Sequence, residues 1–298
     1  MTNRDNFRAG YVTIIGRPNV GKSTLMNTLI GMDIAITSNK PQTTRRQMRT
    51  VLTTEEGQIV FVDTPGIHKA KNALGEFMDD AAISSLEGVD LCLLLVEPST
   101  FIGAGEQSIF EILKKANVPV ILCINKTDTV KGDELLPVID AYRKCLDFKE
   151  IFPISARLGT GTLKLLSGIF KYLPYGEPFY DEETVTNETE RDLVAEIVRQ
   201  SVLRKLDEEV PHGVAVLVGS MKFKKRCTYI QADIVCEKKS HKGIIIGRGG
   251  SKIRQIGSDA RAEIEKLLDR QVMLELFVKV RDKWRENESM IRQFGYKK

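Results

Sequence analysis

Eight residues near the amino terminus constrain the fold of this chain more than any other segment. The run Gly16-Arg17-Pro18-Asn19-Val20-Gly21-Lys22-Ser23 matches the phosphate-binding pattern G-x-x-x-x-G-K-[ST]. It follows residues 11–15, a β-branched apolar run typical of a buried strand, and precedes residues 24–30, which can continue as a helix. Because this strand–loop–helix order is the context in which such a loop holds phosphate, the run predicts a nucleotide site.

The pattern assigns a chemical task to several residues of the loop. Backbone N–H groups of the loop and of the helix N-terminus would surround the β-phosphate. The Lys22 ammonium would reach the β- and γ-phosphates, and the Ser23 hydroxyl would bind Mg²⁺. The nucleotide-binding residues predicted for this segment are Asn19, Val20, Gly21, Lys22, Ser23 and Thr24.

The bulk composition excludes several classes of protein. With 298 residues, 42% of them hydrophobic and 28% charged, the chain is typical of a soluble globular protein with two domains. No apolar stretch is long enough for a membrane span, and the amino terminus lacks the apolar core of a signal peptide. The 5 cysteines form no C-x-x-C pair and the 3 histidines are scattered, so we expect reduced thiols in a cytosolic protein and no metal cluster.

Basic charge is confined to the last quarter of the chain. Residues 1–180 hold 20 basic and 20 acidic side chains, residues 181–220 hold 4 and 10, and residues 221–298 hold 20 and 10. Concentrated positive charge favours a polyanionic partner, with a solvated lysine-rich face as the alternative.

The order of apolar and helical segments predicts two domains. Residues 1–173 alternate continuously apolar strands with amphipathic helices, which indicates a mostly parallel, doubly wound α/β sheet whose ligands bind beyond the carboxyl ends of the strands. Residues 174–188 contain two prolines, a glycine and an acidic cluster, and are predicted to be a linker. Residues 189–298 predict a small α+β domain of order αββααβ, whose first helix begins after Thr189 as N-cap.

A second motif distinguishes a GTPase from an ATP enzyme. The sequence Asn125-Lys126-Thr127-Asp128 directly follows an apolar strand, so it would lie beside the bound nucleotide. The Asp128 carboxylate can accept two hydrogen bonds from guanine, and adenine has no matching pair of donors. Asn125 would bridge this segment to the phosphate loop, and the Lys126 stem would lie against the purine. A backbone N–H of Ser155-Ala156 would bind guanine O6.

The run Asp63-Thr64-Pro65-Gly66 also ends a predicted strand, at residues 59–63. Asp63 would hold Mg²⁺ through water, and the Gly66 N–H would contact the γ-phosphate. The polar segment Pro41-Gln42-Thr43-Thr44-Arg45 would supply the threonine that closes on Mg²⁺. We assign this role to Thr44, with Thr43 as the alternative.

The residue after this motif predicts either slow hydrolysis or an attacking water that is positioned by other means. Ras-like enzymes place there a glutamine that orients the attacking water, whereas this chain has Ile67. We therefore assign catalysis to Lys22, Thr44, Gly66 and Asn19. The Asn19 carbonyl could hold K⁺ where the charge of an arginine finger would lie; as the alternative, Asn19 only forms a turn.

A glycine-rich loop in the basic region predicts an RNA site. The G-x-x-G of Gly247 to Gly250 follows an apolar segment and precedes a helix, the arrangement with which KH domains clamp about four nucleotides. Ile246, Ile253 and Ile256 could line the adjoining groove or belong to the core. The predicted RNA-binding residues are Gly247, Arg248, Gly249, Gly250, Lys252 and Arg254, with the basic run Lys222, Lys224, Lys225 and Arg226 adding salt-sensitive affinity unless it is a solvated hairpin tip.

These motifs together resemble one family over nearly the whole chain. A GTPase domain with G-R-P-N-V-G-K-S, P-Q-T-T-R, D-T-P-G-I-H and N-K-T-D, followed by I-I-G-R-G-G-S-K-I, is similar to the bacterial Era GTPases. The resemblance implies a P-loop GTPase domain followed by a type II KH domain, in a cytoplasmic protein that assists maturation of the small ribosomal subunit. It further implies binding near the 3′ end of the small-subunit ribosomal RNA and peripheral association with the inner face of the membrane.

Three functions follow, of which we favour a GTP-hydrolysing, RNA-binding switch whose RNA affinity depends on the nucleotide. A GTPase that drives a tRNA-modifying domain is opposed by residues 181–298, which show no catalytic cysteine arrangement, cofactor-binding glycines or metal-ligand cluster. Ile67 leaves a third function open, in which the protein is an RNA-binding assembly factor whose nucleotide is structural.

Overall fold

The chain forms two compact units. The computed structural model describes residues 6–32, 34–35, 37, 40, 43–68, 70–206 and 210–296. The first unit comprises Met1–Ala35, Thr44–Lys71 and Gly75–Asn187, and the second comprises Ile36–Thr43, Asn72–Leu74 and Glu188–Lys298. Pro41 and Gln42 of the predicted magnesium loop lie outside the described residues.

A six-stranded sheet forms the centre of the first unit, in the order β2-β3-β1-β4-β5-β6. All neighbouring strands pair in parallel except β2 and β3, which are antiparallel. The strands are β1 (Arg8–Gly16), β2 (Met48–Thr53), β3 (Gly57–Asp63), β4 (Leu91–Val96), β5 (Val120–Ile124) and β6 (Glu150–Pro153). This confirms the doubly wound sheet, although β2 was not predicted.

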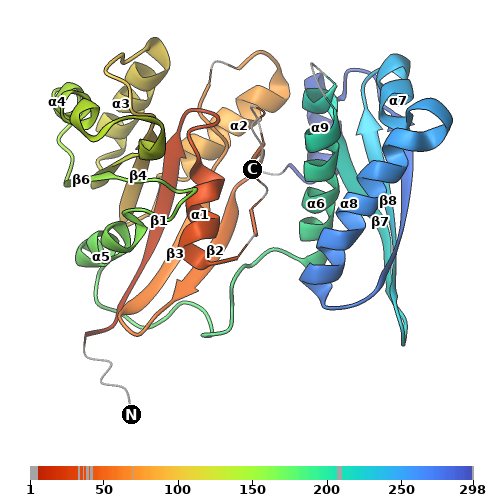
Figure 1. Ribbon diagram of the computed structural model, residues 1–298, viewed down its shortest axis with the longest axis horizontal. Helices are drawn as coiled ribbons and strands as arrows, with labels where there is room; N and C mark the ends of the chain where they lie inside the picture. Colours follow the sequence, from red (N-terminus) through yellow and green to blue (C-terminus); the bar gives the residue numbers. More distant parts are fainter. Residues whose placement is uncertain are drawn as a thin grey trace. The chain divides into compact units, whose positions relative to one another are not determined.

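Helices cover both faces of this sheet, which explains why its central strands are continuously apolar. Every residue of β4 and β5 is buried. Side chains of α2, α3 and α4 pack in one core cluster with alternate residues of β4 and β5, and α1 lies across the sheet in front of β1 and β3 (Figure 1). The helices are α1 (Lys22–Ile30), α2 (Ala73–Ser84), α3 (Ala104–Ala116), α4 (Leu135–Arg143) and α5 (Thr162–Tyr172).

The segment predicted as a linker is hydrogen-bonded along the edge of the first sheet. Val51 N–H donates to the Val185 carbonyl across 2.8 Å. The fully buried side chain of Gln58 accepts from the N–H groups of Phe179 and Tyr180 and donates to the Tyr180 carbonyl. Residues 179–186 therefore run along the first sheet, and we call this segment the strap.

The second unit is a three-stranded sheet covered on one face by helices. Strand β8 (Thr228–Cys236) pairs antiparallel with β7 (Ala215–Phe223) and parallel with β9 (Val272–Val280). Helices α6 (Glu190–Lys205) and α8 (Ser251–Leu268) lie on one face (Figure 1). Thr189 caps α6 by accepting from the Asp192 N–H, as predicted. The remaining helices are α7 (Lys239–Ile246) and α9 (Glu288–Gln293).

No helix in the described part of the chain is long and apolar enough to span a membrane.

Candidate nucleotide site and nucleic-acid interface

The phosphate loop joins β1 to α1 with backbone conformations that its sequence favours. Gly21 has a φ of 102° and Asn19 a φ of 66°, in the left-handed region that these two residue types tolerate best. The Lys22 ammonium donates to the carbonyls of Gly16 across 3.2 Å and Arg17 across 3.0 Å. Burial lowers the pKa of Lys22 to about 8, against the opposing effect of Asp63. The loop thus places a buried amine at the end of β1.

Three oxygen-bearing side chains meet beside this loop. Ser23 Oγ donates to Asp63 Oδ2 across 2.9 Å, and Thr44 Oγ1 lies 2.9 Å from Ser23 Oγ and 3.3 Å from the same carboxylate oxygen. The Thr43 hydroxyl instead donates to the Lys40 carbonyl. Of the two candidate threonines, the structure therefore brings Thr44 to Ser23 and Asp63.

Asp63 is buried and lies at the end of β3. Burial raises the pKa of its carboxyl group, against the lowering effects of Lys22 and of the two hydroxyls. Among the described residues its Oδ1 atom has no hydrogen-bond partner. A buried carboxylate oxygen without a partner, next to two hydroxyls, is a donor set that suits a hard cation such as Mg²⁺.

The segment after Asp63 lies against the phosphate loop. A Cβ atom on Gly66 would come within 2.6 Å of the Pro18 nitrogen, so only glycine allows this approach. The Ile67 N–H donates to the Gly16 carbonyl across 3.3 Å. The Ile67 side chain is buried in the core cluster that contains Ile15. It therefore packs into the protein and offers nothing to an attacking water.

Asn125 connects the two ends of the predicted nucleotide site. Its Nδ2 donates to the Val20 carbonyl across 2.8 Å, and its Oδ1 accepts from the Ala156 N–H across 2.8 Å. The Ser155 N–H donates to the Thr160 carbonyl. The two backbone N–H groups predicted for guanine O6 thus already have partners within the chain, and the Ala156 N–H would share its hydrogen with a base.

Asp128 is held by two neighbours that leave lone pairs available. Ser155 Oγ donates to its Oδ1 across 2.6 Å, and Arg157 lies 2.7 Å from its Oδ2. The hydrogen bond from Ser155 is the main cause of the lowered pKa of Asp128. The carboxylate is therefore ionised at neutral pH, as recognition of guanine requires.

The sequence did not identify the residues that pair with the two predicted base-reading residues, Asp128 and Lys126. Arg157 pairs with Asp128, and Glu97 at the end of β4 pairs with Lys126. Arg157 directly follows Ser155-Ala156, and Glu97 follows a predicted strand, so their positions were the available signal. Charge alone did not mark them, because single exposed charges are common on loops.

The predicted G-x-x-G loop joins α7 to α8 and depends on its glycines. Gly247, Gly249 and Gly250 have φ values of 72°, 54° and 77°. Arg254 donates to the Gly249 carbonyl across 2.6 Å, which fixes its guanidinium beside the loop. Lys252 instead donates to the Lys205 carbonyl at the end of α6. Of the two RNA-binding residues predicted on this helix, Arg254 is therefore the one beside the loop.

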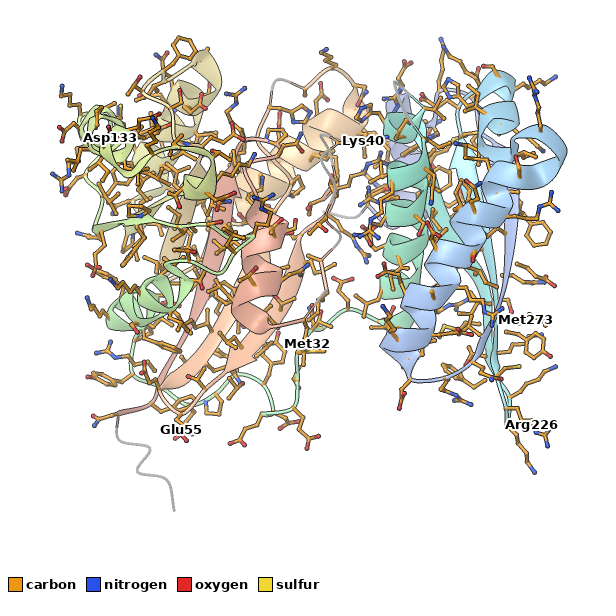
Figure 2. The ribbon with its side chains drawn as sticks, viewed as in Figure 1. Met32, Lys40, Glu55, Asp133, Arg226 and Met273 are labelled. Carbon is orange, nitrogen blue, oxygen red and sulfur yellow. The ribbon has the colours of Figure 1, made fainter. Side chains whose placement is uncertain are left out.

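An open hollow of about 370 Å³ follows the loop between α8 and β9. Ile253 lines it, whereas Ile256 is fully buried in the core and Ile246 packs against that core. The sequence missed the other lining residues, which are Arg254, Gly257, Ser258, Arg261, Leu274 and Leu276. The basic run is exposed, and Figure 2 shows Arg226 at the end of the β7–β8 hairpin. These features form the candidate nucleic-acid interface.

The match to family models follows the same division of the chain. Residues 11–126 match the family described as 50S ribosome-binding GTPase. Residues 209–285 match the KH domain. The second match opposes a tRNA-modifying domain in this part of the chain.

The chain is also similar to other proteins along nearly its whole length. The GTPase Era of Ruminiclostridium cellulolyticum is 49% identical over 98% of both chains, and that of Clostridium perfringens is 48% identical over 98% of this chain and 99% of its own. A crystal structure of a variant of Aquifex aeolicus Era bound to GDP and AlF4− has a TM-score of 0.94 at 39% identity and covers 97% of this chain and 99% of its own. Era in complex with MgGDPNP and nucleotides 1506–1542 of 16S ribosomal RNA has a TM-score of 0.95, with the same identity and coverage.

The predicted guanine-reading motif, the phosphate loop and the KH domain thus occur together in one chain. This chain is nearly half identical to the two clostridial relatives over 98% of its length, and the protein is a GTP-hydrolysing member of the Era family.

Proposed function

We propose that the protein is a GTP-driven switch that binds the 3′ region of the small-subunit ribosomal RNA through its KH domain and assists assembly of the 30S subunit. The observation that carries this proposal is the hollow between α8 and β9, which begins at a glycine-rich basic loop. The solved Era bound to an RNA of this kind supports it. Crosslinking the protein to RNA in cells and mapping the bound nucleotides tests it, and sites outside the 3′ region of this RNA would contradict it.

Magnesium and phosphate would be held by the side chains that meet at the end of β1 and β3. Ser23 and Thr44 would bind Mg²⁺ through their hydroxyls and Asp63 through water, which fits the unpartnered Oδ1 of Asp63. The metal would neutralise charge on the phosphate oxygens. Lys22 would exchange its two carbonyl partners for the β- and γ-phosphates, and Gly66 would donate its N–H to the γ-phosphate.

The buried position of Ile67 supports slow intrinsic turnover, because no side chain at this position orients water. We assign the missing charge to K⁺ held by the side-chain carbonyl of Asn19, within the loop that contacts the phosphates. Phosphate release over many turnovers, measured in K⁺ and Na⁺ buffers with Lys22→Ala as the inactive control, tests this assignment. Equal rates in the two buffers would remove it.

The loop that carries Thr44 supports a dependence of RNA affinity on the nucleotide. Thr44 is counted in the first unit and the preceding Thr43 in the second. Within the second unit, the buried Arg199 of α6 donates to the Thr43 carbonyl. A γ-phosphate that draws Thr44 toward Mg²⁺ would therefore pull on a loop held by α6. Equal RNA affinities with GDP and with a non-hydrolysable GTP analogue, at fixed salt, would contradict this coupling.

The same proposal places the protein in the cytoplasm, with peripheral contact to the inner face of the membrane as the family resemblance implies. Fractionation of cells that express the tagged full chain, with and without high salt, tests this placement.

A further inference from the structure

The second unit has an exposed aromatic side chain, Phe223, at a position where no helix covers the sheet. The ring of Phe223 ends β7, and the residue is 53% exposed. Alternation along the strand places it on the same face as Met221, which packs against the core under the helices. Helix α8 ends beside this row, since Glu265 accepts a hydrogen bond from the Val272 N–H. Phe223 thus lies on the helix-covered face, beyond the end of α8.

A cation contacts this ring, and further basic residues follow it on the hairpin. The Arg270 guanidinium lies 5.4 Å from the ring centroid and donates to the Lys224 carbonyl across 2.8 Å, which fixes it there. The exposed residues that flank Phe223 along the hairpin are also basic, and they are Lys222, Lys224, Lys225 and Arg226. Of these, Lys222 and the Lys224 ammonium lie on the opposite face of the hairpin, beside Tyr229. An exposed ring among cations suits a partner that combines negative charge with flat apolar faces. Unpaired nucleotides have both.

The ring also lies near one end of the candidate RNA groove. The groove runs along α8 from the G-x-x-G loop to Arg261 and Leu274. Leu274 and Val272 are successive residues on the same face of β9. Val272 pairs with Thr228 of β8, and Thr228 pairs in turn with Phe223 of β7. Standard strand geometry then puts Phe223 about 7 Å further along the sheet and about 10 Å across it. A strand of RNA that leaves the groove at this end would need to extend only this distance to reach the ring.

We propose that Phe223 and Arg270 extend the RNA groove and hold an unpaired base beyond the nucleotides clamped by the G-x-x-G loop. The base stacks on the exposed ring, and Arg270 binds the adjoining phosphate. Because every base has a π-face, this position tolerates any base. The inference rests on the proposed RNA-binding function and deepens it.

The hairpin offers a matched control on its other face. Tyr229 pairs with Lys222 and Met273 in the outward-facing row, and the Lys224 ammonium lies 4.2 Å from its ring centroid. Tyr229 is therefore an aromatic residue covered by a cation, on the same hairpin but on the face away from the groove. Phe223→Ala and Tyr229→Ala remove comparable groups, and Phe223→Leu retains apolar bulk without a flat ring.

The test compares two RNA probes with the full chain. We expect Phe223→Ala to weaken binding of nucleotides 1506–1542 of 16S ribosomal RNA by about five- to tenfold, with a smaller loss for Phe223→Leu. We expect Tyr229→Ala to leave this affinity unchanged. An RNA of about four nucleotides, which fills only the clamped part of the groove, should bind all three variants like the unsubstituted protein.

Several outcomes would overturn the extension. These are an unchanged affinity of Phe223→Ala for the long RNA, equal losses for Phe223→Ala and Tyr229→Ala, or a loss by Phe223→Ala that also affects the short RNA. Reduced binding to anionic phospholipid vesicles with unchanged RNA affinity would assign the ring to a membrane surface instead. Arg248→Glu separates the two proposals, because it should weaken both RNAs. If it weakens neither, the proposed function fails as well.

Discussion

The side-chain amide of Asn125 spans 105 positions of the sequence to donate to the Val20 carbonyl, while its oxygen accepts from Ala156. It is 2% exposed, so both hydrogen bonds form away from water. One side chain thus ties the phosphate loop to the two segments that would read guanine.

Replacing Asn125 should therefore destabilise the protein even without nucleotide. Asn125→Ala leaves a buried N–H and a buried carbonyl without partners, and we expect a loss of about 1–3 kcal/mol in the free energy of unfolding. Thr129→Val, which removes an exposed hydroxyl bonded to the Lys126 carbonyl, should cost less than about 0.5 kcal/mol. Denaturant unfolding of the nucleotide-free protein measures both, and similar small losses would show that the bridge carries little stability.

The two neighbouring threonines should differ in their effect on magnesium. Thr44→Val keeps the shape of the side chain but removes the hydroxyl beside Ser23 and Asp63. We expect the Mg²⁺ concentration needed for binding a GTP analogue to rise by about tenfold. Thr43→Val removes only a hydrogen bond to the Lys40 carbonyl and should have little effect. A Mg²⁺ titration with a fluorescent analogue decides between them, and the reverse order would assign the metal to Thr43.

Nucleotide affinity should fall as the pH rises through about 8, the lowered pKa of Lys22 in the free protein. Phosphates favour the ammonium form, so above this pH the free protein must take up a proton in order to bind. The loss is at most about tenfold per pH unit. Calorimetry of GDP binding in buffers of different ionisation enthalpy measures the uptake. Lys22→Arg stays protonated and should show none near pH 9, and equal uptake by both proteins would contradict the role of Lys22.

The His68–Asp79 pair should make stability depend on pH. The hydrogen bond that the His68 ring donates to Asp79 is the main cause of the raised pKa of His68, whose Nδ1 lies 3.2 Å from the carboxylate. The folded-state pKa exceeds the unfolded one, so the gain in stability is complete below the ordinary histidine pKa of 6.5 and is lost as the pH rises through the raised pKa. We expect about 0.5–1 kcal/mol for this partly exposed pair. Unfolding of the wild type and Asp79→Asn at several pH values measures it; parallel curves would refute it.

The sequence could bring much of the candidate nucleotide site together, because the phosphate loop, residues 63–66 and residues 125–128 each directly follow an apolar strand, and parallel strands bring such ends to one edge. Strands at the sheet edge and helices with an atypical composition were harder to predict. Strand β2 mixes polar and apolar residues because it lies at the edge of the sheet, and α4 carries a proline in its first turn, which hid its helical pattern. The base-reading partners Arg157 and Glu97 depend on contacts between segments that are distant in sequence.

The hydrogen bonds that hold the strap to the first sheet were not visible in the sequence for a related reason. Its prolines, glycine and acidic residues are typical of a linker, and composition does not report which backbone groups are hydrogen-bonded. The signal lay in another segment, because Gln58 is a polar residue in the otherwise apolar strand β3. A buried amide in such a strand needs partners, and here they are the backbone of Phe179 and Tyr180.

Replacing Gln58 should consequently release the strap. Gln58→Leu keeps the volume of the side chain but leaves three backbone groups of residues 179–180 without their partner, and we expect a loss of about 1–3 kcal/mol. Cleavage by a protease specific for acidic residues should become faster at Asp181, Glu182 and Glu183, because the segment must detach to be cut. Gln47 directly precedes β2, and its side-chain amide donates to the Ala81 carbonyl, away from the strap. Gln47→Leu should therefore leave the cleavage rate unchanged. If both variants are cut at the rate of the wild type, Gln58 does not hold the strap.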